Sequence, residues 1–321
     1  FNWTVNDIKA VSSTTANGTY KIGDVIAITV TFSEAVTVTG IPQLTLETGS
    51  TDAVVNYSSG SGSTTLTFNY TVASGHISSD LDYVNTTALA LNSGTIKDAE
   101  GNNATLTLAS PGGSNSLGAN KALVVDTTAP TLTVSSVSLS ADTGTSSTDE
   151  ITKTASQTIS GTLSGALASG DILYGSVNNG SSWTDITSKV SSDTAISWDG
   201  ATLSGSNNIV FKITDGTGND SNTTGSTAYV LDTTAPTLAI TLSDTDIKFG
   251  ETSTITFNFS ETPSNFAAAD ITVQRGSIGS IAVNGGDNTL YTATFTPTPS
   301  ANNANNVVTV GQAWTDAAGN A

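Results

Sequence analysis

Acidic residues recur at a fixed spacing in three short turns of the sequence. The pattern Asp-x-x-Gly-Asn occupies residues 98–102, 215–219 and 316–320. Carboxylate and amide oxygens are the ligands that a hard cation such as Ca²⁺ prefers. The same residue types also form turns without any metal, because Asp and Asn bond to their own backbone and Gly accepts positive φ. The turns therefore predict either calcium sites or purely structural turns.

Two further repeats run in step with these turns. The segment 124–132 returns almost unchanged at 230–238, 106 residues later, and both copies contain Asp-Thr-Thr-Ala-Pro. The segments 28–34 and 255–261 both end in Phe-Ser-Glu. A period of about 100 residues is a common domain size and indicates tandem domains. The sequence predicts a strand-like segment at 1–7 followed by domains at 8–126, 127–232 and 233–321.

The composition excludes several classes of protein. The 321 residues include 9 Lys+Arg, 27 Asp+Glu, one His and no Cys, with a formal net charge of −18. Disulfide frameworks, thiol catalysis and Cys-based zinc sites are therefore impossible. The acidic balance argues against a nucleic-acid-binding surface, and no apolar run is long enough to insert into a membrane. With one histidine and no unique segment interrupting the repeats, we expect no enzymatic activity.

Hydrophobic residues alternate along several segments with a period of two. The clearest are 25–32, 65–72 and 209–213, which are rich in β-branched residues and are separated by Asn-Gly and Asp-Gly turns. This pattern is typical of half-buried strands. About seven such strands per 100 residues predict an all-β fold of tandem Ig-like β-sandwich domains. Short linkers fixed by Pro130 and Pro236 predict an extended rod.

The repeats resemble a known family. The Asp-Thr-Thr-Ala-Pro linkers, the Asp-x-x-Gly-Asn turns and the run from Asp142 to Thr152 are similar to bacterial Ig-like repeats of giant extracellular adhesins and biofilm surface proteins. The resemblance covers essentially the whole chain. It implies an extracellular or cell-surface spacer, often stiffened by calcium between domains.

In a seven-strand sandwich, the linker aspartate, the loop after the second strand and the Asp-x-x-Gly-Asn turn meet at one end of the domain. We therefore expect Ca²⁺ as cofactor and group the candidate ligands by domain junction. The second junction has Asp232, Glu261, Asp316 and Asn320, with Asp142, Asp149 and Glu150 approaching from the preceding domain. The first junction has Asp126, Asp215 and Asn219, with Asp24 as a further candidate. The N-terminal end of the first domain has Asp7, Glu34, Asp98 and Asn102.

One strand of the pattern is displaced. A strand follows the Asp-x-x-Gly-Asn turn in the first two domains, whereas the third turn is followed only by Ala321. The segment 1–7 reads as such a strand, with Phe1, Trp3 and Val5 on one face. These side chains are expected to complete the third domain of a neighbour, which is either an adjoining repeat or another copy of this chain. The partners expected are therefore repeats or copies arranged head to tail.

These expectations together indicate a structural repeat of an extracellular fibre or adhesin stalk. One alternative is a surface-layer or sheath protein whose subunits also contact each other laterally. A further alternative is a glycan-binding adhesin module, in which Trp183, Trp198 or Trp314 stacks on sugar rings, although a buried core position is the usual role of Trp in a sandwich.

Overall fold

The structure is a computed structural model that describes residues 6–248, 250–299 and 306–321. The chain divides into two compact units. Unit 1 comprises Phe1–Thr131, Ala168–Asp171 and Ile213–Ser221, and unit 2 comprises Leu132–Leu167, Ile172–Lys212 and Asn222–Ala321. Phe1, Trp3 and Val5, the expected strand residues, lie outside the described residues.

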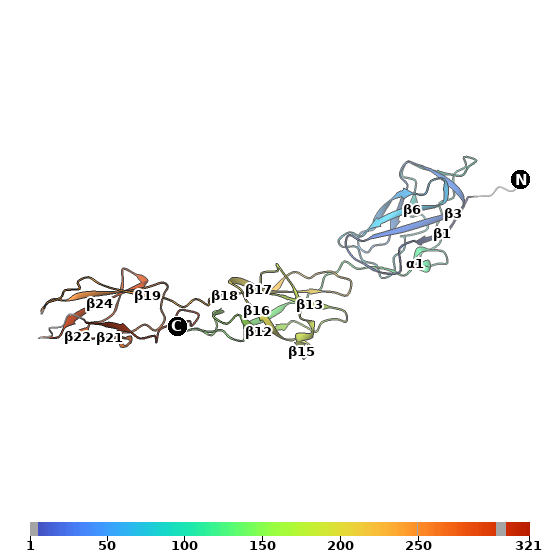
Figure 1. Ribbon diagram of the computed structural model, residues 1–321. Helices are drawn as coiled ribbons and strands as arrows, with labels where there is room; N and C mark the ends of the chain where they lie inside the picture. The colour runs from blue at the N-terminus through green and yellow to red at the C-terminus, as the bar shows by residue number, and fades with distance from the viewer. Residues whose placement is uncertain (1–5, 249, 300–305) are drawn as a thin grey trace. The chain divides into compact units, whose positions relative to one another are not determined.

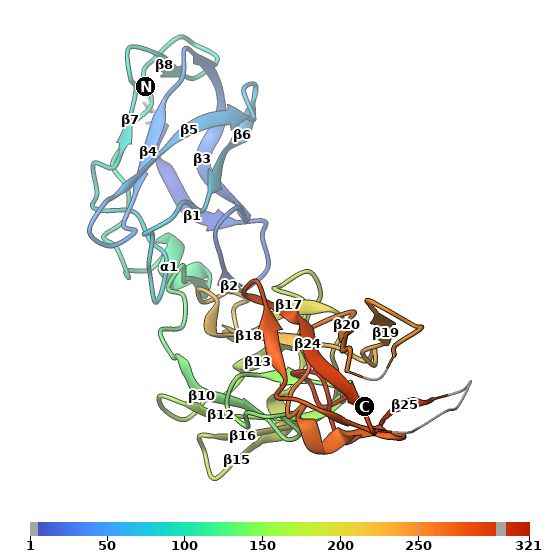
Figure 2. The ribbon, with the colours of Figure 1, turned by 90° about the vertical axis from the view of Figure 1, so that its left-hand side faces the viewer.

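Unit 1 contains the first sandwich, built on the long strand β3. The main sheet has the order β1-β3-β6-β5-β4-β7, and Figure 2 shows β4 between β5 and β7. The period of two decides which side chains are buried, as in β6, where Leu66, Phe68 and Tyr70 are buried and alternate with polar residues. The strands are β1 Ile8–Ser13, β2 Gly18–Tyr20, β3 Val25–Thr39, β4 Gln43–Leu46, β5 Ala53–Ser59, β6 Ser63–Thr71, β7 Leu89–Ala90, β8 Thr95–Lys97 and β9 Leu123–Val125.

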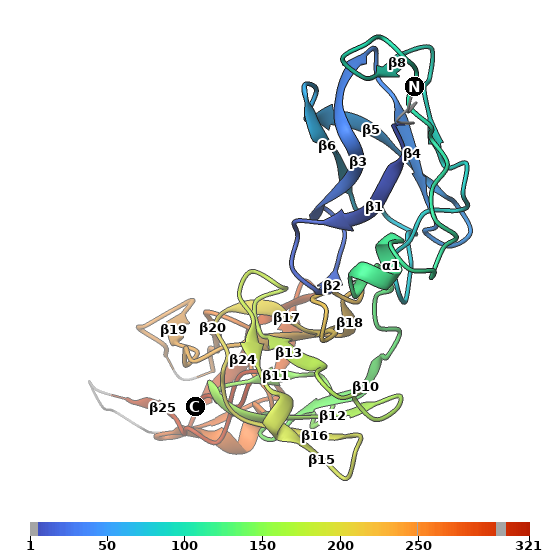
Figure 3. The ribbon, with the colours of Figure 1, turned by 90° about the vertical axis from the view of Figure 1, so that its right-hand side faces the viewer.

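A short helix, α1 (Leu117–Asn120), lies beside β1 in unit 1 (Figure 3). The Ser116 side chain caps this helix by accepting a bond from the Ala119 N–H, and the Asn120 side chain donates to the Val11 carbonyl at 2.8 Å. After the helix, β9 pairs in parallel with β2. This parallel pair closes the first sandwich and leads directly into the linker at Asp126.

The second sandwich, in unit 2, has two facing sheets (Figure 1). Their orders are β10-β12-β16-β15 and β11-β18-β17-β13-β14. The last strand, β18, pairs antiparallel with β17 and parallel with β11. The strands are β10 Val134–Leu139, β11 Ile151–Thr152, β12 Ser156–Leu163, β13 Ile172–Ser176, β14 Thr184–Asp185, β15 Val190–Ser191, β16 Ala195–Thr202, β17 Ser206–Thr214 and β18 Thr224–Leu231, with a 3-10 turn η1 at Thr187–Lys189.

The third sandwich, also in unit 2, has one sheet of order β19-β20-β24-β22, with β23 on β24, and a second sheet of β21 and β25. Its core is aromatic: the Phe259 ring packs edge-on against Phe266, Tyr291 and Trp314. The elements are β19 Leu238–Leu242, β20 Ser253–Phe259, η2 Ala268–Asp270, β21 Ile271–Val273, β22 Gly276–Ile278, β23 Ala282–Asn284, β24 Asp287–Pro297 and β25 Val308–Val310.

The second and third sandwiches differ at one strand. In the second sandwich β17 has β18 on one side and β13 on the other, whereas β25 of the third pairs only with β21 among the described residues. Val308 and Val310 of β25 are half-buried rather than buried. The edge of β25 that would carry the counterpart of β18 is therefore open within the part of the chain that the structure describes.

The all-β Ig-like architecture agrees with the sequence-based prediction, and the predicted strands at 25–32, 65–72 and 209–213 fall within β3, β6 and β17 apart from Val72. None of the helices in the described ranges has the length and apolarity needed to span a bilayer. The sheets of unit 2 separate into two sets, one within 134–231 and one within 238–310. The predicted domain boundaries at 126 and 232 remain predictions.

Candidate metal centre

The three Asp-x-x-Gly-Asn turns have the same internal hydrogen bonds. In each, the Asp carboxylate Oδ1 accepts from the backbone N–H of the closing Asn at 2.8 Å. The side-chain amide of that Asn donates to the other carboxylate oxygen, Oδ2, at 3.0, 3.0 and 2.7 Å in chain order. The glycines have φ of +87°, +94° and +88°, a conformation that favours Gly. The sequence pattern thus encodes one rigid turn, used three times.

These bonds change the acidity of the carboxylates. The bond from the Asn102 side chain lowers the pKa of Asp98, with smaller contributions from backbone N–H groups of the turn. Burial alone would raise the pKa of Asp215, but bonds from Asn219, Gly218 and Thr217 outweigh it, and the pKa is lowered. Both aspartates therefore stay ionised at a lower pH than an ordinary aspartate does.

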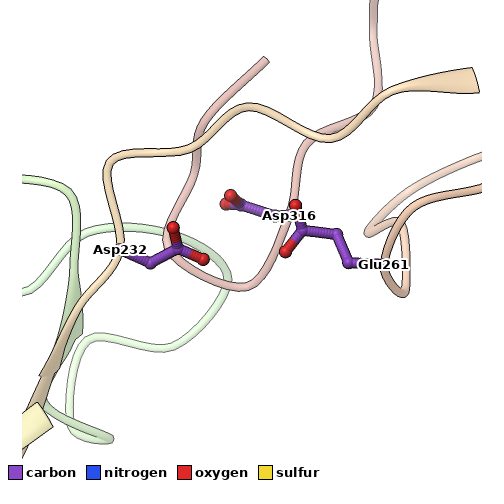
Figure 4. A group of neighbouring side chains, drawn as sticks. All are labelled: Asp232, Glu261 and Asp316. Atoms are coloured by element: carbon purple, nitrogen blue, oxygen red, sulfur yellow. The ribbon is translucent and has the colours of Figure 1, made fainter. Parts of the chain in front are cut away.

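Three carboxylates converge at the end of the third sandwich (Figure 4). Asp232 directly follows β18, Glu261 lies just after β20, and Asp316 opens the third turn. One carboxylate oxygen from each lies within 4.8 Å of the other two, and no other group of three or more His, Cys, Asp or Glu residues meets this condition among the described residues. Asp316 is 1 % exposed. The structure thus brings together three residues that the sequence grouped from separate segments.

The electrostatics of this group are unfavourable without a cation. Burial raises the pKa of Glu261, and the neighbouring carboxylates of Asp232 and Asp316 raise it further. The salt bridge found in the described part of the chain joins Lys189 to Asp199, not any lysine to these acids. Carboxylate oxygens are hard ligands of the kind that Ca²⁺ prefers. An ion bound between the three carboxylates would relieve the repulsion between their charges.

Asn320 holds the group in place with its amide nitrogen. That nitrogen donates to the Asp232 carbonyl at 2.9 Å and to Asp316 Oδ2 at 2.7 Å. The Asn219 amide does the same for the Asp126 carbonyl, at 3.1 Å. The sequence grouped Asn219 and Asn320 with the ligands; the structure turns their amide nitrogens, which are donors, toward the acidic groups. Both residues therefore position the linker against the turn.

A second acidic group lies in the loop between β10 and β11. Asp142 Oδ2 accepts from the Glu150 N–H at 3.2 Å, and Asp149 Oδ1 accepts from the Ile151 N–H at 3.1 Å. Asp142 Oδ1 and Glu150 Oε2 are buried and have no hydrogen-bond partner. Burial, followed by the Asp142 charge, raises the pKa of Glu150. Buried oxygens without donors are costly unless a cation or a proton compensates.

The same loop contacts the third turn. The Thr143 hydroxyl donates to the Ala318 carbonyl at 2.6 Å, and Lys153 Nζ donates to the Gly319 carbonyl at 2.5 Å. A Cβ built on Gly144 would lie 1.9 Å from the Ala317 carbonyl oxygen, so the two backbones approach closely. Asp142, Asp149 and Glu150 thus belong to a loop that contacts this turn, while their carboxylates do not join the three-carboxylate group.

The first-junction residues are only partly gathered. Asp126, Asp215 and Asn219 lie together in unit 1, where the Thr217 hydroxyl approaches Asp126 Oδ2 at 3.4 Å. Asp24 is engaged locally, because its carboxylate accepts from the Lys21 N–H at 2.9 Å. No third acidic side chain joins Asp126 and Asp215 in the described part of unit 1 within the distance that defines the Asp232 group.

At the start of the first sandwich, the main chain of Asp7 pairs with Ser33. Asp7 donates to Ser33 Oγ at 3.0 Å and its carbonyl accepts from the Ser33 N–H at 2.8 Å. Thr237 makes the same two bonds with Ser260. Asp7 therefore occupies the position of Thr237, not that of the linker Asp232. Asp98 is buried and Asn102 bonds to it, while Glu34 lies within β3, and no three-carboxylate group forms here among the described residues.

The tryptophans considered for sugar stacking lie mostly in cores. Trp198 is 5 % exposed and Trp314 is 7 % exposed, so neither presents a ring face to solvent. Trp183 is partly exposed, with the ammonium of Lys212 5.2 Å from its ring centroid. The ring of the single histidine, His76, is stacked on that of Tyr70. A hydrogen bond of 2.8 Å joins His76 Nδ1 to the Tyr70 hydroxyl.

Two lysines that contact these turns were not predicted from the sequence. Lys153 bonds to the third turn as described above, and Lys21 Nζ donates to the Gly218 carbonyl of the second turn at 3.0 Å. Each follows directly on the short strand, β2 or β11, that pairs in parallel with the last strand of its sandwich. That position could have been found by comparing the segments that precede the second strand of each repeat.

Residues 232–321 match the family described as bacterial Ig-like domain. No curated protein gives a significant match to this chain. Among solved structures, the chain is similar to a tetra-tandem repeat in the extending region of a large adhesion protein, at 14% identity, covering 98% of this chain and 75% of that chain with a TM-score of 0.26. It is also similar to an I-band fragment of titin, at 10% identity, covering 95% and 98% with a TM-score of 0.32.

A third similarity is to dimeric latent PorU from Porphyromonas gingivalis, at 9% identity, covering 95% of this chain and 30% of that chain with a TM-score of 0.22. The sheets and the family match together define the class: this is a nearly all-β chain of Ig-like β-sandwiches. Its last sandwich lies within the residues that match the family described as bacterial Ig-like domain.

Proposed function

We propose that this chain is a structural repeat segment of an extracellular adhesin stalk or fibre, in which Ca²⁺ braces the linkers between Ig-like sandwiches. The observation that carries the proposal is the convergence of Asp232, Glu261 and Asp316 within 4.8 Å. Asp232 lies in the linker, whereas the other two lie in loops of the third sandwich. An ion held by all three would fix the linker to the sandwich and restrict hinge motion.

The loop at Asp142–Glu150 supports the same function. Its two buried, partnerless oxygens are suited to a cation, and the loop bonds to the third turn through Thr143. An ion at Asp142 and Glu150 would stiffen the loop that contacts the third turn. At the first junction, Asp126 and Asp215 offer fewer carboxylates, so we expect weaker calcium binding there.

The open edge of β25 supports head-to-tail assembly. Because β17 carries β18 at the corresponding edge, a strand from outside the described residues would complete the third sandwich by β-strand addition. We propose that Phe1, Trp3 and Val5 of another copy, or of an adjoining repeat, supply this strand. Where another copy supplies the strand, deleting residues 1–5 should abolish self-association of the chain in sedimentation experiments, while an unchanged sedimentation coefficient would contradict donation by another copy.

The acidic surface fits a location outside the cell. At a net charge of −18, copies repel each other at low ionic strength, and divalent cations reduce that repulsion. A surface-layer or sheath protein would use the same chemistry with lateral contacts added. Electron micrographs of the assembled protein separate the two, since single threads indicate a stalk and a two-dimensional lattice indicates a layer.

Calcium titration of the chelated protein tests the proposal directly. Wild-type chain should bind Ca²⁺ with a Kd of about 10⁻⁴ to 10⁻³ M, as expected of extracellular modules. The Glu261→Gln variant should bind at least about tenfold more weakly at that site, because one charged ligand is lost. The control Asp193→Asn removes one exposed charge from the same unit, at a φ of +65° that Asn tolerates. Calorimetry showing no Ca²⁺ binding to wild type would refute the metal-braced function.

A further inference from the structure

Two lysines make equivalent contacts with two of the three turns. In unit 1, Lys21 Nζ donates to the Gly218 carbonyl at 3.0 Å, and in unit 2 Lys153 Nζ donates to the Gly319 carbonyl at 2.5 Å. Both acceptors are the glycine of an Asp-x-x-Gly-Asn turn. The ammonium group therefore lies beside an acidic turn, where a charge-assisted bond to the carbonyl is favourable.

The backbone shows that the two lysines occupy the same structural position. The Asp126 N–H donates to the Tyr20 carbonyl at 3.0 Å, and the Asp232 N–H donates to the Thr152 carbonyl at 2.9 Å. In each case the acceptor is the residue directly before the lysine. The lysine is thus placed by the parallel strand pair that leads into the linker.

Lys248 is the third member of this series. The sequence Lys21-Ile-Gly-Asp24 corresponds to Lys248-Phe-Gly-Glu251. The Lys21 N–H bonds to Asp24 Oδ2 and the Lys248 N–H bonds to Glu251 Oε2, both at 2.9 Å. The return bonds, from Asp24 N–H and Glu251 N–H to the lysine carbonyls, are also present. The same local turn therefore presents Lys248, which is exposed and whose ammonium has no partner in the described chain.

Turn 98–102 likewise has no lysine contact among the described residues. The turn 98–102 has the same internal bonds as the other two, yet no lysine reaches the Gly101 carbonyl among the described residues. Its surface is also uncovered: Asn102 is exposed, whereas Asn219 is 8 % exposed and Asn320 is half-buried. Turn 98–102 therefore has the same internal hydrogen bonds as the other two turns but lacks their lysine contact and their burial.

We infer that Lys248 of one copy of this chain binds the Gly101 carbonyl in the turn 98–102 of a second copy. Each observed pair joins a lysine to the turn of the following sandwich, and in the proposed head-to-tail assembly of copies the sandwich that follows Lys248 is the first sandwich of the next copy, which contains turn 98–102. This inference rests on the proposed head-to-tail assembly and names its interface. The second copy's turn would bring Asp98 and Glu100, acidic groups complementary to Lys248.

Crosslinking tests the interface, and the absence of native cysteine makes it specific. Lys248→Cys and Glu100→Cys variants of the full chain are mixed in Ca²⁺ and treated with a short bismaleimide. We expect a heterodimer from this mixture and none above background from the control mixture of Lys189→Cys with Glu100→Cys. Lys189 is a suitable control because its ammonium pairs with Asp199 instead of with a turn. Equal yields in the two mixtures overturn the inference.

A second measurement does not depend on crosslinker geometry. Sedimentation equilibrium should show self-association about tenfold weaker for Lys248→Gln than for wild type, the ratio expected for one lost charge-assisted hydrogen bond. Lys189→Gln should associate like wild type. If copies associate but Lys248→Gln has no effect, the inference fails and head-to-tail assembly survives. If wild-type chain does not associate at all, both fail, while calcium binding to the Asp232 group is judged separately by calorimetry.

Discussion

The side-chain amide of Asn320 donates a 2.9 Å hydrogen bond to the main-chain carbonyl of Asp232. The bond joins a turn of the third sandwich to the linker that enters it. The same amide also bonds to Asp316, so one side chain fixes the linker and the acidic turn together. Mechanical continuity between linker and sandwich therefore has a defined structural basis that does not depend on metal.

The first prediction concerns this amide. Asn320→Ala removes both bonds and should lower the free energy of unfolding of the third sandwich by about 1–3 kcal/mol. The matched control is Asn102→Ala, because Asn102 makes the bond to its own aspartate without a bond to a linker carbonyl among the described residues. We expect a smaller loss for Asn102→Ala in thermal or denaturant unfolding. Equal losses would mean that the Asp232 bond contributes nothing.

The second prediction concerns the Glu261 carboxylate. In chelator at pH 7, Glu261→Gln should raise the melting temperature of the third sandwich, because it removes a half-buried charge next to Asp232 and Asp316. In about 10 mM Ca²⁺ the order should reverse, since a Kd of about 10⁻³ to 10⁻⁴ M stabilises wild type by roughly 1.4–2.7 kcal/mol. Calorimetric scans in both buffers check this. A variant less stable than wild type in chelator contradicts the proposed repulsion.

The third prediction concerns pH. The folded-state pKa of Glu261 is raised above its ordinary value of 4.5, so the folded protein binds the proton more readily than the unfolded chain. Its stabilising contribution is complete below pH 4.5 and is lost as pH rises through the raised folded-state pKa. In chelator, the free energy of unfolding of wild type minus that of Glu261→Gln should therefore decrease as pH rises across that window. A difference that is constant from pH 4 to 7 would exclude the effect.

Protons and calcium also compete for the same carboxylate. Ca²⁺ affinity should therefore fall as the solution is acidified from pH 7 toward the Glu261 pKa. Asp98 and Asp215 behave in the opposite sense, because their lowered pKa values give a contribution that is present above pH 3.8 and is lost in stronger acid. This contrast makes the Glu261 site distinguishable from the turns.

The fourth prediction concerns backbone packing at Gly144. Gly144→Ala should destabilise the contact between the Asp142–Glu150 loop and the third turn, because the new Cβ would clash with the Ala317 carbonyl oxygen. Gly285→Ala is the control: Gly285 also has positive φ, at +66°, but nothing lies within 4 Å of its Cβ position. Both variants carry a strain cost of about 1 kcal/mol, and Gly144→Ala should cost about 1–3 kcal/mol more. Equal unfolding free energies would show that the loop does not pack on the turn in solution.

The all-β fold and the strand positions could be predicted because they depend on local pattern. A hydrophobic period of two buries one face of each strand, and turn residues such as Asn and Gly mark the strand ends. The strands β6 and β17 could therefore be predicted from the sequence. The convergence of Asp232, Glu261 and Asp316 was also inferable, because sandwich topology places their loops at one end. The position of Asp7, which corresponds to Thr237 and not to Asp232, could not be predicted. Strand register depends on long-range pairing, which no local motif reports.

The repeat, the turn chemistry and the acidic character of this protein could be predicted, because they follow from composition and from residues close together in the chain. How each turn is used depends on long-range packing. The amide of Asn320 faces Asp232 as a donor, Lys153 covers Gly319, and two carboxylate oxygens of the Asp142–Glu150 loop are buried without donors. These outcomes depend on which segments, about 90 to 170 residues apart, pack against one another, and on the requirement that buried polar groups find partners.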